Sequence, residues 1–392
     1  MSGDDNPKHG KSKTRKLFFL IFWLVILLAL VLIVLSLVPG SRPGQSMLSQ
    51  MLSLRAPSIS VSEFNFEVGR DRVFAHSNGS IAAAGTFGLQ VLGPDGQETL
   101  RHSFRSATPA IYENNGFFIT YDIGGSSVYV FNSSGILSTV DASGLIVSAS
   151  INKNGWFCIV TQERGSYRGT VSVYNSNGAR VYEVKVGSGF VLSAELSPDN
   201  KNLAILSMAD TGSQITYYGG IDSHKDEPDE IYRFGNRIVI DIKFIAGAEI
   251  LAVSTQAVQF IDFSGNTRNN WQNLFEGKRL AGYTISDSYI AVHLYDYAIG
   301  YSGKITTISF DGTVVGEIES SFELVSMSSI KDTLVILQSD GSVFFDKYLN
   351  QFQAAETSVS VATAEHTLAL SEDMALVAND HFAVVIRRGE DN

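Results

Sequence analysis

The sequence predicts an all-β protein: a β-propeller of four-stranded antiparallel blades, preceded by one transmembrane helix. Three observations lead to this prediction. A hairpin pattern recurs along most of the chain, one long apolar segment lies near the N-terminus, and the composition favours strands and tight turns. The 392 residues include 35 Gly, 24 Phe and 15 Tyr, together with abundant Val, Ile and Ser, which suits strands better than helices.

The recurring hairpin is an apolar strand, a polar-glycine turn and a second strand. Clean copies turn at Asp95-Gly96, Ser134-Gly135, Asn177-Gly178, Ser264-Gly265 and Asp311-Gly312, and weaker copies turn at Gly219-Gly220 and Leu349-Asn350. Successive turns are about 38 to 47 residues apart. This spacing brackets the roughly 40–50 residues of one propeller blade, so each hairpin is interpreted as the outer half of a blade.

Seven hairpins account for seven blades, and the tail from Ser358 to Arg388 holds about three more strands. The segment Ile59–Phe66 alternates apolar and polar residues as a lone strand does. Pairing this strand with the tail would close the ring and remove its exposed edges. Eight blades give about 42 residues per blade over the 334 residues from position 59 onward. Eight is therefore favoured, and seven, at about 48 residues per blade, is the alternative.

The predicted transmembrane helix covers residues 17–38, a run of 22 residues without a charged side chain. At about 1.5 Å per residue it spans roughly 33 Å, enough for the hydrocarbon core of a bilayer. The run is too long for a cleaved signal peptide, and no A-x-A site follows it. It is interpreted as an uncleaved signal-anchor, and the lipid bilayer is its predicted partner. Residues 1–16 form a basic tail, residues 39–57 a linker, and residues 58–388 the propeller.

Charge sets the predicted orientation. The tail holds five basic and two acidic residues, which leaves 24 basic and 38 acidic residues in the rest of the chain. Positive flanks stay in the cytoplasm, so the propeller is placed outside the plasma membrane. A domain this acidic disfavours nucleic-acid binding. The single cysteine, Cys158, excludes an intramolecular disulfide and is interpreted as a buried apolar residue; the lack of disulfides fits a bacterial envelope protein.

One blade carries Ser197-Pro198-Asp199 followed by Leu203-Ala204, a step that resembles the first turn of WD40-type and related bacterial propeller blades. The layout of the chain as a whole resembles a bacterial family of unknown function, whose members are single-pass, membrane-anchored extracytoplasmic propellers. It is also similar to the eight-bladed quinoprotein-like propellers of envelope assembly lipoproteins, although this chain lacks their lipid-bearing cysteine. The resemblance implies the architecture and no activity.

No catalytic, cofactor-binding or metal-binding set of residues is predicted. Asp210-Thr211-Gly212 matches the aspartic protease signature, but no second copy supplies the other carboxylate, so a turn is preferred. The seven histidines are scattered without metal-ligand spacing. Asp222–Glu230 holds five acidic residues without the glycine of a calcium loop, and it is interpreted as a solvated loop.

The best candidate for a partner or ligand loop contains Tyr295, Tyr297 and Tyr301, because tyrosine combines apolar area with a polar group. The leading hypothesis for function is a non-enzymatic scaffold that binds another envelope protein. The second is a sensor or binder of a small molecule or cell-wall glycan, which thermal-shift screening with sugars and wall fragments would reveal. The third is a propeller hydrolase or quinone-dependent dehydrogenase, which requires polar residues of several blades to converge in the channel.

Overall fold

The computed structural model describes residues 64–93, 96–162, 167–265, 271–297, 299–339, 341–353 and 363–388. The chain divides into two compact units, residues 1–60 and residues 61–392, and every described residue belongs to the second unit. The predicted tail, transmembrane segment and linker lie outside the described residues. Within the described ranges, no helix has the length and apolar character needed to cross a membrane.

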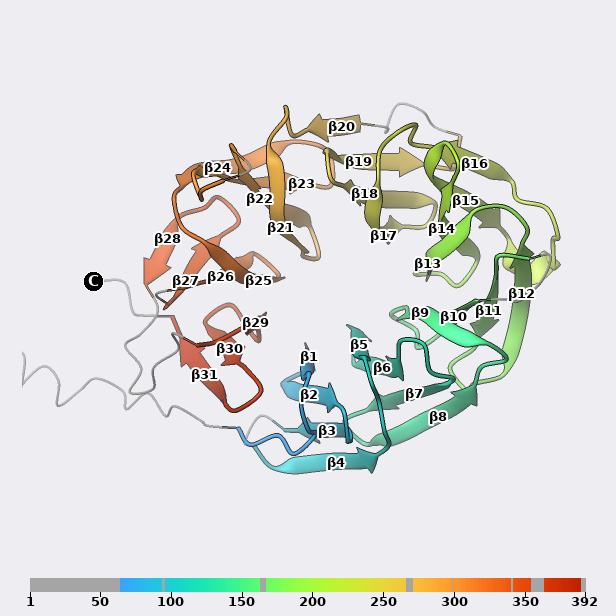
Figure 1. Ribbon diagram of the computed structural model, residues 1–392, viewed down its shortest axis with the longest axis horizontal. Helices are drawn as coiled ribbons and strands as arrows, with labels where there is room; N and C mark the ends of the chain where they lie inside the picture. The colour runs from blue at the N-terminus through green and yellow to red at the C-terminus, as the bar shows by residue number, and fades with distance from the viewer. Residues whose placement is uncertain are drawn as a thin grey trace, which may run out of the picture. The chain divides into compact units, whose positions relative to one another are not determined.

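The second unit is a propeller whose eight sheets follow one another around a common centre (Figure 1). Blade 1 contains β1 (Val73–Ser77), β2 (Ser80–Gly85), β3 (Gly88–Leu92) and β4 (Glu98–Ser103). Blade 2 contains β5 (Pro109–Asn114), β6 (Phe117–Asp122), β7 (Ser127–Asn132) and β8 (Gly135–Asp141). Blade 3 contains β9 (Leu145–Ile151), β10 (Phe157–Gln162), β11 (Gly169–Tyr174) and β12 (Arg180–Val186). Blade 4 contains β13 (Phe190–Leu196), β14 (Asn202–Ala209), β15 (Gly212–Gly219), the short 3-10 helix η1 (Ile221–Ser223) and β16 (Glu230–Arg233).

The second half of the ring repeats the same plan. Blade 5 contains β17 (Val239–Ala246), β18 (Glu249–Ser254), β19 (Ala257–Asp262) and β20 (Trp271–Leu274). Blade 6 contains β21 (Arg279–Ile285), β22 (Tyr289–Tyr295), β23 (Gly303–Ser309) and β24 (Val314–Ser320). Blade 7 contains β25 (Leu324–Ile330), β26 (Thr333–Gln338), β27 (Gly341–Asp346) and β28 (Gln351–Gln353). Blade 8 contains β29 (His366–Ala369), β30 (Met374–Ala378) and β31 (Ala383–Arg387).

Within each blade the strands are paired antiparallel in chain order, and the first strand lies nearest the common centre (Figure 1). The prediction of eight blades is confirmed. Each predicted polar-glycine turn joins the third strand of a blade to the fourth, and the turn residue adopts a positive φ: +77° at Gly178, and +64° even at Leu349, where the repeat has lost its glycine. The local turn signal therefore identified the blades correctly.

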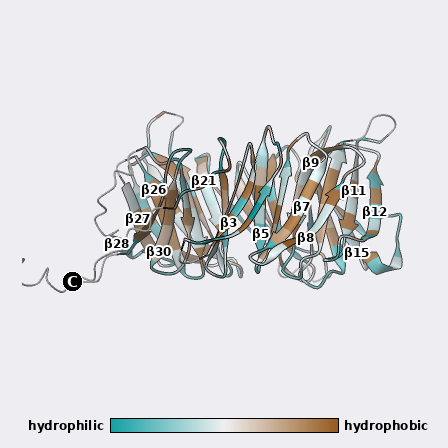
Figure 2. Cartoon of the chain, turned by 90° about the horizontal axis from the view of Figure 1, so that it is seen from below, coloured by the Kyte–Doolittle hydropathy of each residue, from teal (hydrophilic) through white to brown (hydrophobic). Residues whose placement is uncertain are grey.

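The core is divided among the interfaces between neighbouring blades. Eight buried clusters occur in the described residues, one for each interface. The second strand of a blade is covered on both faces, which explains why β2 and β14 read as continuous apolar runs. The fourth strand has a solvent-facing side, and β4 accordingly alternates exposed and half-buried residues. The side view shows these apolar stretches between two rims of loops (Figure 2).

The N-terminal segment closes the ring, as predicted. Phe64, Phe66 and Val68 are buried in the cluster between blades 8 and 1. The backbone N–H of Phe64 donates to the carbonyl of Ala383 in β31 at 2.8 Å, so this segment lies beside the last strand of blade 8. Its described residues form no regular strand, and the sheet of blade 8 has three strands. The first part of the predicted strand, residues 59–63, lies outside the described residues.

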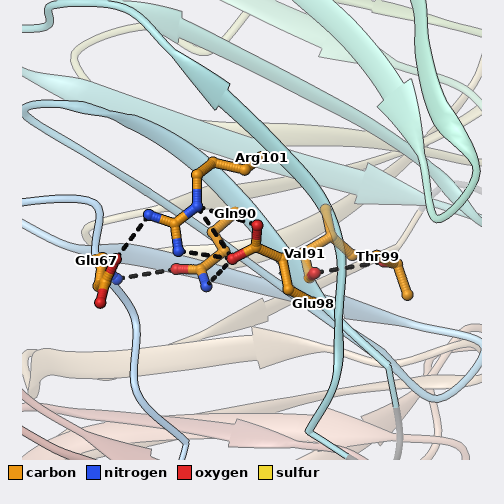
Figure 3. A network of polar contacts seen from close by, with 6 residues as sticks. All are labelled: Glu67, Gln90, Val91, Glu98, Thr99 and Arg101. Atoms are coloured by element: carbon orange, nitrogen blue, oxygen red, sulfur yellow. Dashed lines mark hydrogen bonds and ion pairs between the residues drawn. The ribbon is translucent and has the colours of Figure 1, made fainter.

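A polar network fastens the same segment to blade 1 (Figure 3). The backbone N–H of Glu67 donates to Oε1 of Gln90 at 2.8 Å, and Nε2 of Gln90 donates to Glu98 at 2.7 Å. Arg101 pairs with Glu67 at 2.8 Å and with Glu98 at 2.6 Å, and the hydroxyl of Thr99 donates to the carbonyl of Val91. Because these ion pairs are exposed, each contributes at most about 1 kcal/mol. The buried aromatic side chains are the stronger part of the closure.

We expect Phe66→Ala to lower the free energy of unfolding by about 3–5 kcal/mol, because it empties a buried site between the first and last blades. Phe66 is 1% exposed and its ring meets that of Phe74 edge to face at 5.5 Å. Denaturant unfolding of the full chain in detergent measures the change. Phe190→Ala, at a site 58% exposed, is the control and should cost less than about 0.5 kcal/mol. Equal losses in the two variants would contradict closure by burial.

Candidate functional site

The two faces of the propeller are built from different connections. Because the strands alternate in direction, the turns between second and third strands lie on the same face as the links between blades; we call this the upper face. The turns between first and second strands, and between third and fourth strands, form the lower face. One set of first-strand side chains lines the pockets of the channel between the two faces, and the other set packs into the core between blades.

Large apolar side chains are exposed mainly on the upper face and at its channel mouth. Those next to an upper turn or link are Phe87, Ile123, Leu145, Tyr167, Phe190, Ile238, Leu274, Tyr297, Ile299 and Tyr301. Those at the mouth are Leu192, Ile240 and Val325. Exposed patches of this kind mark interaction surfaces. Sequence analysis predicted only the tyrosine loop of this surface.

Each of the three residues at the channel mouth lies at a local register shift between two strands. In β13, Val191 pairs with Ser207 and Ser193 with Leu206, so Leu192 has no partner across the strand. In β17, Ile240 is left over in the same way between Val239 and Asp241, and in β25 so is Val325. A β-bulge redirects the side chain of the additional residue. β13 and β17 belong to neighbouring blades and β25 to blade 7, and each bulge lies near the upper end of its strand and presents an aliphatic group at the channel mouth.

The predicted tyrosine loop links β22 to β23 on the upper face. Tyr295 is the last residue of β22 and is buried; its hydroxyl accepts a hydrogen bond from the backbone N–H of Leu324 at 2.8 Å. Tyr297 is 71% exposed and Tyr301 is partly exposed. The ring of Tyr301 meets that of Tyr295 edge to face at 5.8 Å. Tyr295 thus supports the loop, while Tyr297 and Tyr301 remain predicted contact residues.

The channel holds a cluster of titratable groups that sequence analysis did not predict. Glu195 of β13, Asp241 and Lys243 of β17, and Tyr283 of β21 come from three successive blades, and Tyr112 of β5 faces them. The hydroxyl of Tyr283 donates to Oδ2 of Asp241 at 3.1 Å. Only Asp241 and Lys243 are close in sequence; they lie two residues apart on β17. Only closure of the ring brings the rest together.

Burial controls the charge of this cluster. Burial, and then the charge of Asp241, raise the pKa of Glu195 to about 8 from 4.5, while Lys243 and Ser150 oppose the shift. Burial likewise raises the pKa of Asp241, against the hydrogen bond from Tyr283 and the charge of Lys243. Burial and then the charge of Asp241 raise the pKa of Tyr283. One lysine therefore only partly compensates the carboxylates around it.

Two pockets meet at this cluster. One, of about 620 Å³, is lined by Glu195 and Lys243 together with Asn114, Asn152 and Asp199 of the first turns. The other, of about 310 Å³, shares Lys243, Ser286 and Asp287 with it and extends to the first strands on the far side of the channel. Polar groups of several blades thus converge in the channel. Among the described residues, no group of three His, Cys, Asp or Glu side chains could hold a metal ion.

The structure gives the positions of three further features singled out in the sequence. Asp210 and Thr211 form the turn between β14 and β15, as expected; a side chain at Gly212 would lie 1.8 Å from the carbonyl oxygen of Gly235. Cys158 is fully buried in β10, and burial raises the pKa of its thiol to about 12, so the interpretation as a buried apolar residue is confirmed. Asp222–Glu230 is largely exposed on the lower face.

We expect the free energy of unfolding to depend on the protonation of Glu195. Folded Glu195 keeps its proton up to about pH 8, whereas the unfolded carboxyl loses it near its ordinary pKa of 4.5. The folded state binds the additional proton between these values, so this contribution to stability falls as the pH rises through that window. The free energy of unfolding of Glu195→Gln, relative to that of the native chain, should therefore increase as the pH rises from 5 to 9. Denaturant unfolding at each pH measures this difference.

The exposed Glu227 on the lower face gives the matched control. Glu227→Gln should show the same pH dependence as the native chain. A difference between Glu195→Gln and the native chain that stays constant from pH 5 to pH 9 would show that Glu195 ionises normally in the folded state.

Comparison with solved structures shows the same fold. The C-terminal WD40 domain of Sif2 superposes with a TM-score of 0.57 at 13% identity, covering 84% of this chain and 99% of that one. BamB from Moraxella catarrhalis gives 0.51 at 14% identity, covering 85% and 98%. Raptor from Chaetomium thermophilum gives a TM-score of 0.51 at 11% identity. The match covers 88% of this chain and 30% of the Raptor chain. At these identities the likeness concerns the fold alone.

Among curated protein sequences, none matches this chain significantly. A family model described as a family of unknown function, DUF5711, matches residues 61–349. That range begins at the closing segment, ends in blade 7 and covers most of the propeller. The predicted resemblance to a family of unknown function with WD40-like propellers is confirmed, and the chain belongs to the DUF5711 family.

Proposed function

We propose that this chain is a membrane-anchored, extracytoplasmic propeller that binds other proteins of the cell envelope and catalyses no reaction. The observation that supports it most directly is the concentration of exposed aromatic and aliphatic side chains on the upper face. Phe190, Ile238 and Tyr297 are each more than half exposed there. Keeping such groups in water is unfavourable, and a protein partner would cover them.

Two arginines lie over aromatic rings at the upper face. The guanidinium of Arg168 lies 5.4 Å from the ring centre of Phe190, and that of Arg279 lies 4.9 Å from the ring centre of Tyr295. Aromatic residues and arginine are the side chains most enriched at the energetic centres of protein interfaces. The composition of the upper face therefore favours protein recognition.

The sequence supports the location. The uncharged run of residues 17–38 is long enough to span a bilayer, and the basic residues before it favour a cytoplasmic N-terminus. A propeller outside this membrane would be held within reach of envelope proteins. The channel pockets support the second hypothesis, a binder of a small molecule or glycan.

Cysteine labelling tests the orientation. We expect Tyr348→Cys, at a position 59% exposed, to react with a membrane-impermeant maleimide in intact cells or spheroplasts, because the propeller lies outside. Ser12→Cys in the basic tail should react only after lysis. The native Cys158 is buried and provides the unreactive background. Labelling of Ser12→Cys but not Tyr348→Cys before lysis would reverse the proposed topology.

Chemical cross-linking tests the scaffold function. Formaldehyde treatment of native membranes should link the tagged chain to the same protein in independent preparations. Phe190→Asp should lower its recovery by more than about tenfold, because loss of a central aromatic contact costs 2 kcal/mol or more. Tyr348→Asp on the lower face is the control and should retain the partner. If no protein is recovered reproducibly with the native chain, the scaffold function is wrong.

A further inference from the structure

One sector of the upper face differs from the rest of the molecule in charge. The sector consists of the upper ends of blades 3, 4 and 5. Its exposed apolar side chains are Leu145, Tyr167, Phe190, Leu192, Ile238 and Ile240. They come from three consecutive blades, at the upper turns and links and at the channel mouth.

Four basic residues end strands or flank turns in this sector: Arg168, Lys185, Arg233 and Arg237. Of the described acidic residues in this sector, Asp210 lies in an upper turn and Asp241 follows Ile240 on β17, while Asp141 and Glu276 lie at the borders to blades 2 and 6. The sector thus carries a positive excess, although the whole chain has a net charge of −11. A positive patch on an acidic protein attracts a negative partner that the rest of the surface would repel.

The cations and the apolar groups are interleaved. Arg168 lies over the ring of Phe190 at 5.4 Å, and the ammonium of Lys185 lies over the ring of Tyr167 at 5.6 Å. Nη1 of Arg237 donates to Gln259 at 3.2 Å and to Gln272 at 3.1 Å, which holds its guanidinium against β19 and β20 of blade 5. A ligand that fits this surface must present carboxylates and apolar side chains at close spacing.

The shape favours a protein segment over a lipid surface. The bulges in β13 and β17 place Leu192 and Ile240 on channel-lining strands, so part of the apolar surface faces the mouth of the channel. A bilayer is flat on this scale and would leave the mouth residues uncovered. A chain segment or loop can enter the mouth and cover them together with Phe190.

We propose that the upper ends of blades 3–5 bind an acidic segment of another envelope protein, with apolar side chains of that segment seated at the channel mouth. This inference rests on the proposed scaffold function and adds the place and the chemistry of the partner. The carboxylates of the segment pair with Arg168, Lys185 and Arg233. Its apolar side chains cover Phe190, Leu192 and Ile240.

Site-specific photo-cross-linking in cells tests the proposal with the full chain. The photoreactive residue p-benzoylphenylalanine replaces Phe190 in one variant and Tyr348 in the other, two positions of nearly equal exposure, 58% and 59%, on opposite faces. We expect a protein adduct from position 190 and not from position 348. The cross-linked peptide, sequenced by mass spectrometry, should carry net negative charge and apolar residues.

Charge variants provide the matched control. Arg168→Glu with Lys185→Glu should lower the yield of adduct from position 190 by roughly tenfold or more, as loss of two charge contacts predicts. Arg168→Lys with Lys185→Arg keeps the charge and should keep the adduct. Unchanged melting temperatures show that both variants are folded.

Three results would overturn the proposal: a neutral or basic cross-linked peptide, adducts with lipid alone, or a yield unaffected by charge reversal. A protein adduct from position 348 only would also overturn it while leaving the scaffold function intact. Absence of a protein adduct from both positions, together with no reproducible partner after formaldehyde treatment, would remove the scaffold function itself.

Discussion

The structure depends on closing a ring whose two ends are far apart in sequence. Each blade covers the buried faces of its neighbours, so seven of the eight interfaces form between segments that follow one another along the chain. The last interface joins blade 8 to blade 1 and contains Phe64, Phe66 and Val68. Without these side chains the apolar faces of two blades would be exposed to water. The cost of bringing distant segments together is offset by burial at this one place.

Closure also creates the channel and its chemistry. The first strand of each blade has one set of side chains against the core and another toward the channel. Glu195, Asp241 and Lys243 occupy channel positions that would be ordinary solvent-facing sites on an isolated blade. In the ring they lie close to one another, and burial raises the pKa of Glu195 and the pKa of Asp241. The unusual protonation is therefore a property of the assembled ring.

The two faces differ in their turns and in their exposed side chains. Lower-face turns such as Ser197–Lys201 are held by side chain to backbone hydrogen bonds, for example from the N–H of Asn202 to the hydroxyl of Ser197 at 2.9 Å. The upper face instead exposes Phe190, Ile238 and Ile240, and Arg168 lies over the ring of Phe190. In the proposed interaction, the positive, apolar sector of this acidic propeller selects a partner of the opposite charge. This difference between the faces supports recognition through one face of a rigid disc.

The sequence alone determined the blades, because turns and strand patterns are local. The seven polar-glycine turns, the three C-terminal strands, the closing segment and the turn at Asp210 were all predicted from neighbouring residues. It also singled out Tyr295, Tyr297 and Tyr301, but only the structure separated buried Tyr295 from exposed Tyr297. The channel cluster and the bulges at Leu192 and Ile240 were not predictable from sequence, because they depend on register and on contacts between blades that no local pattern encodes.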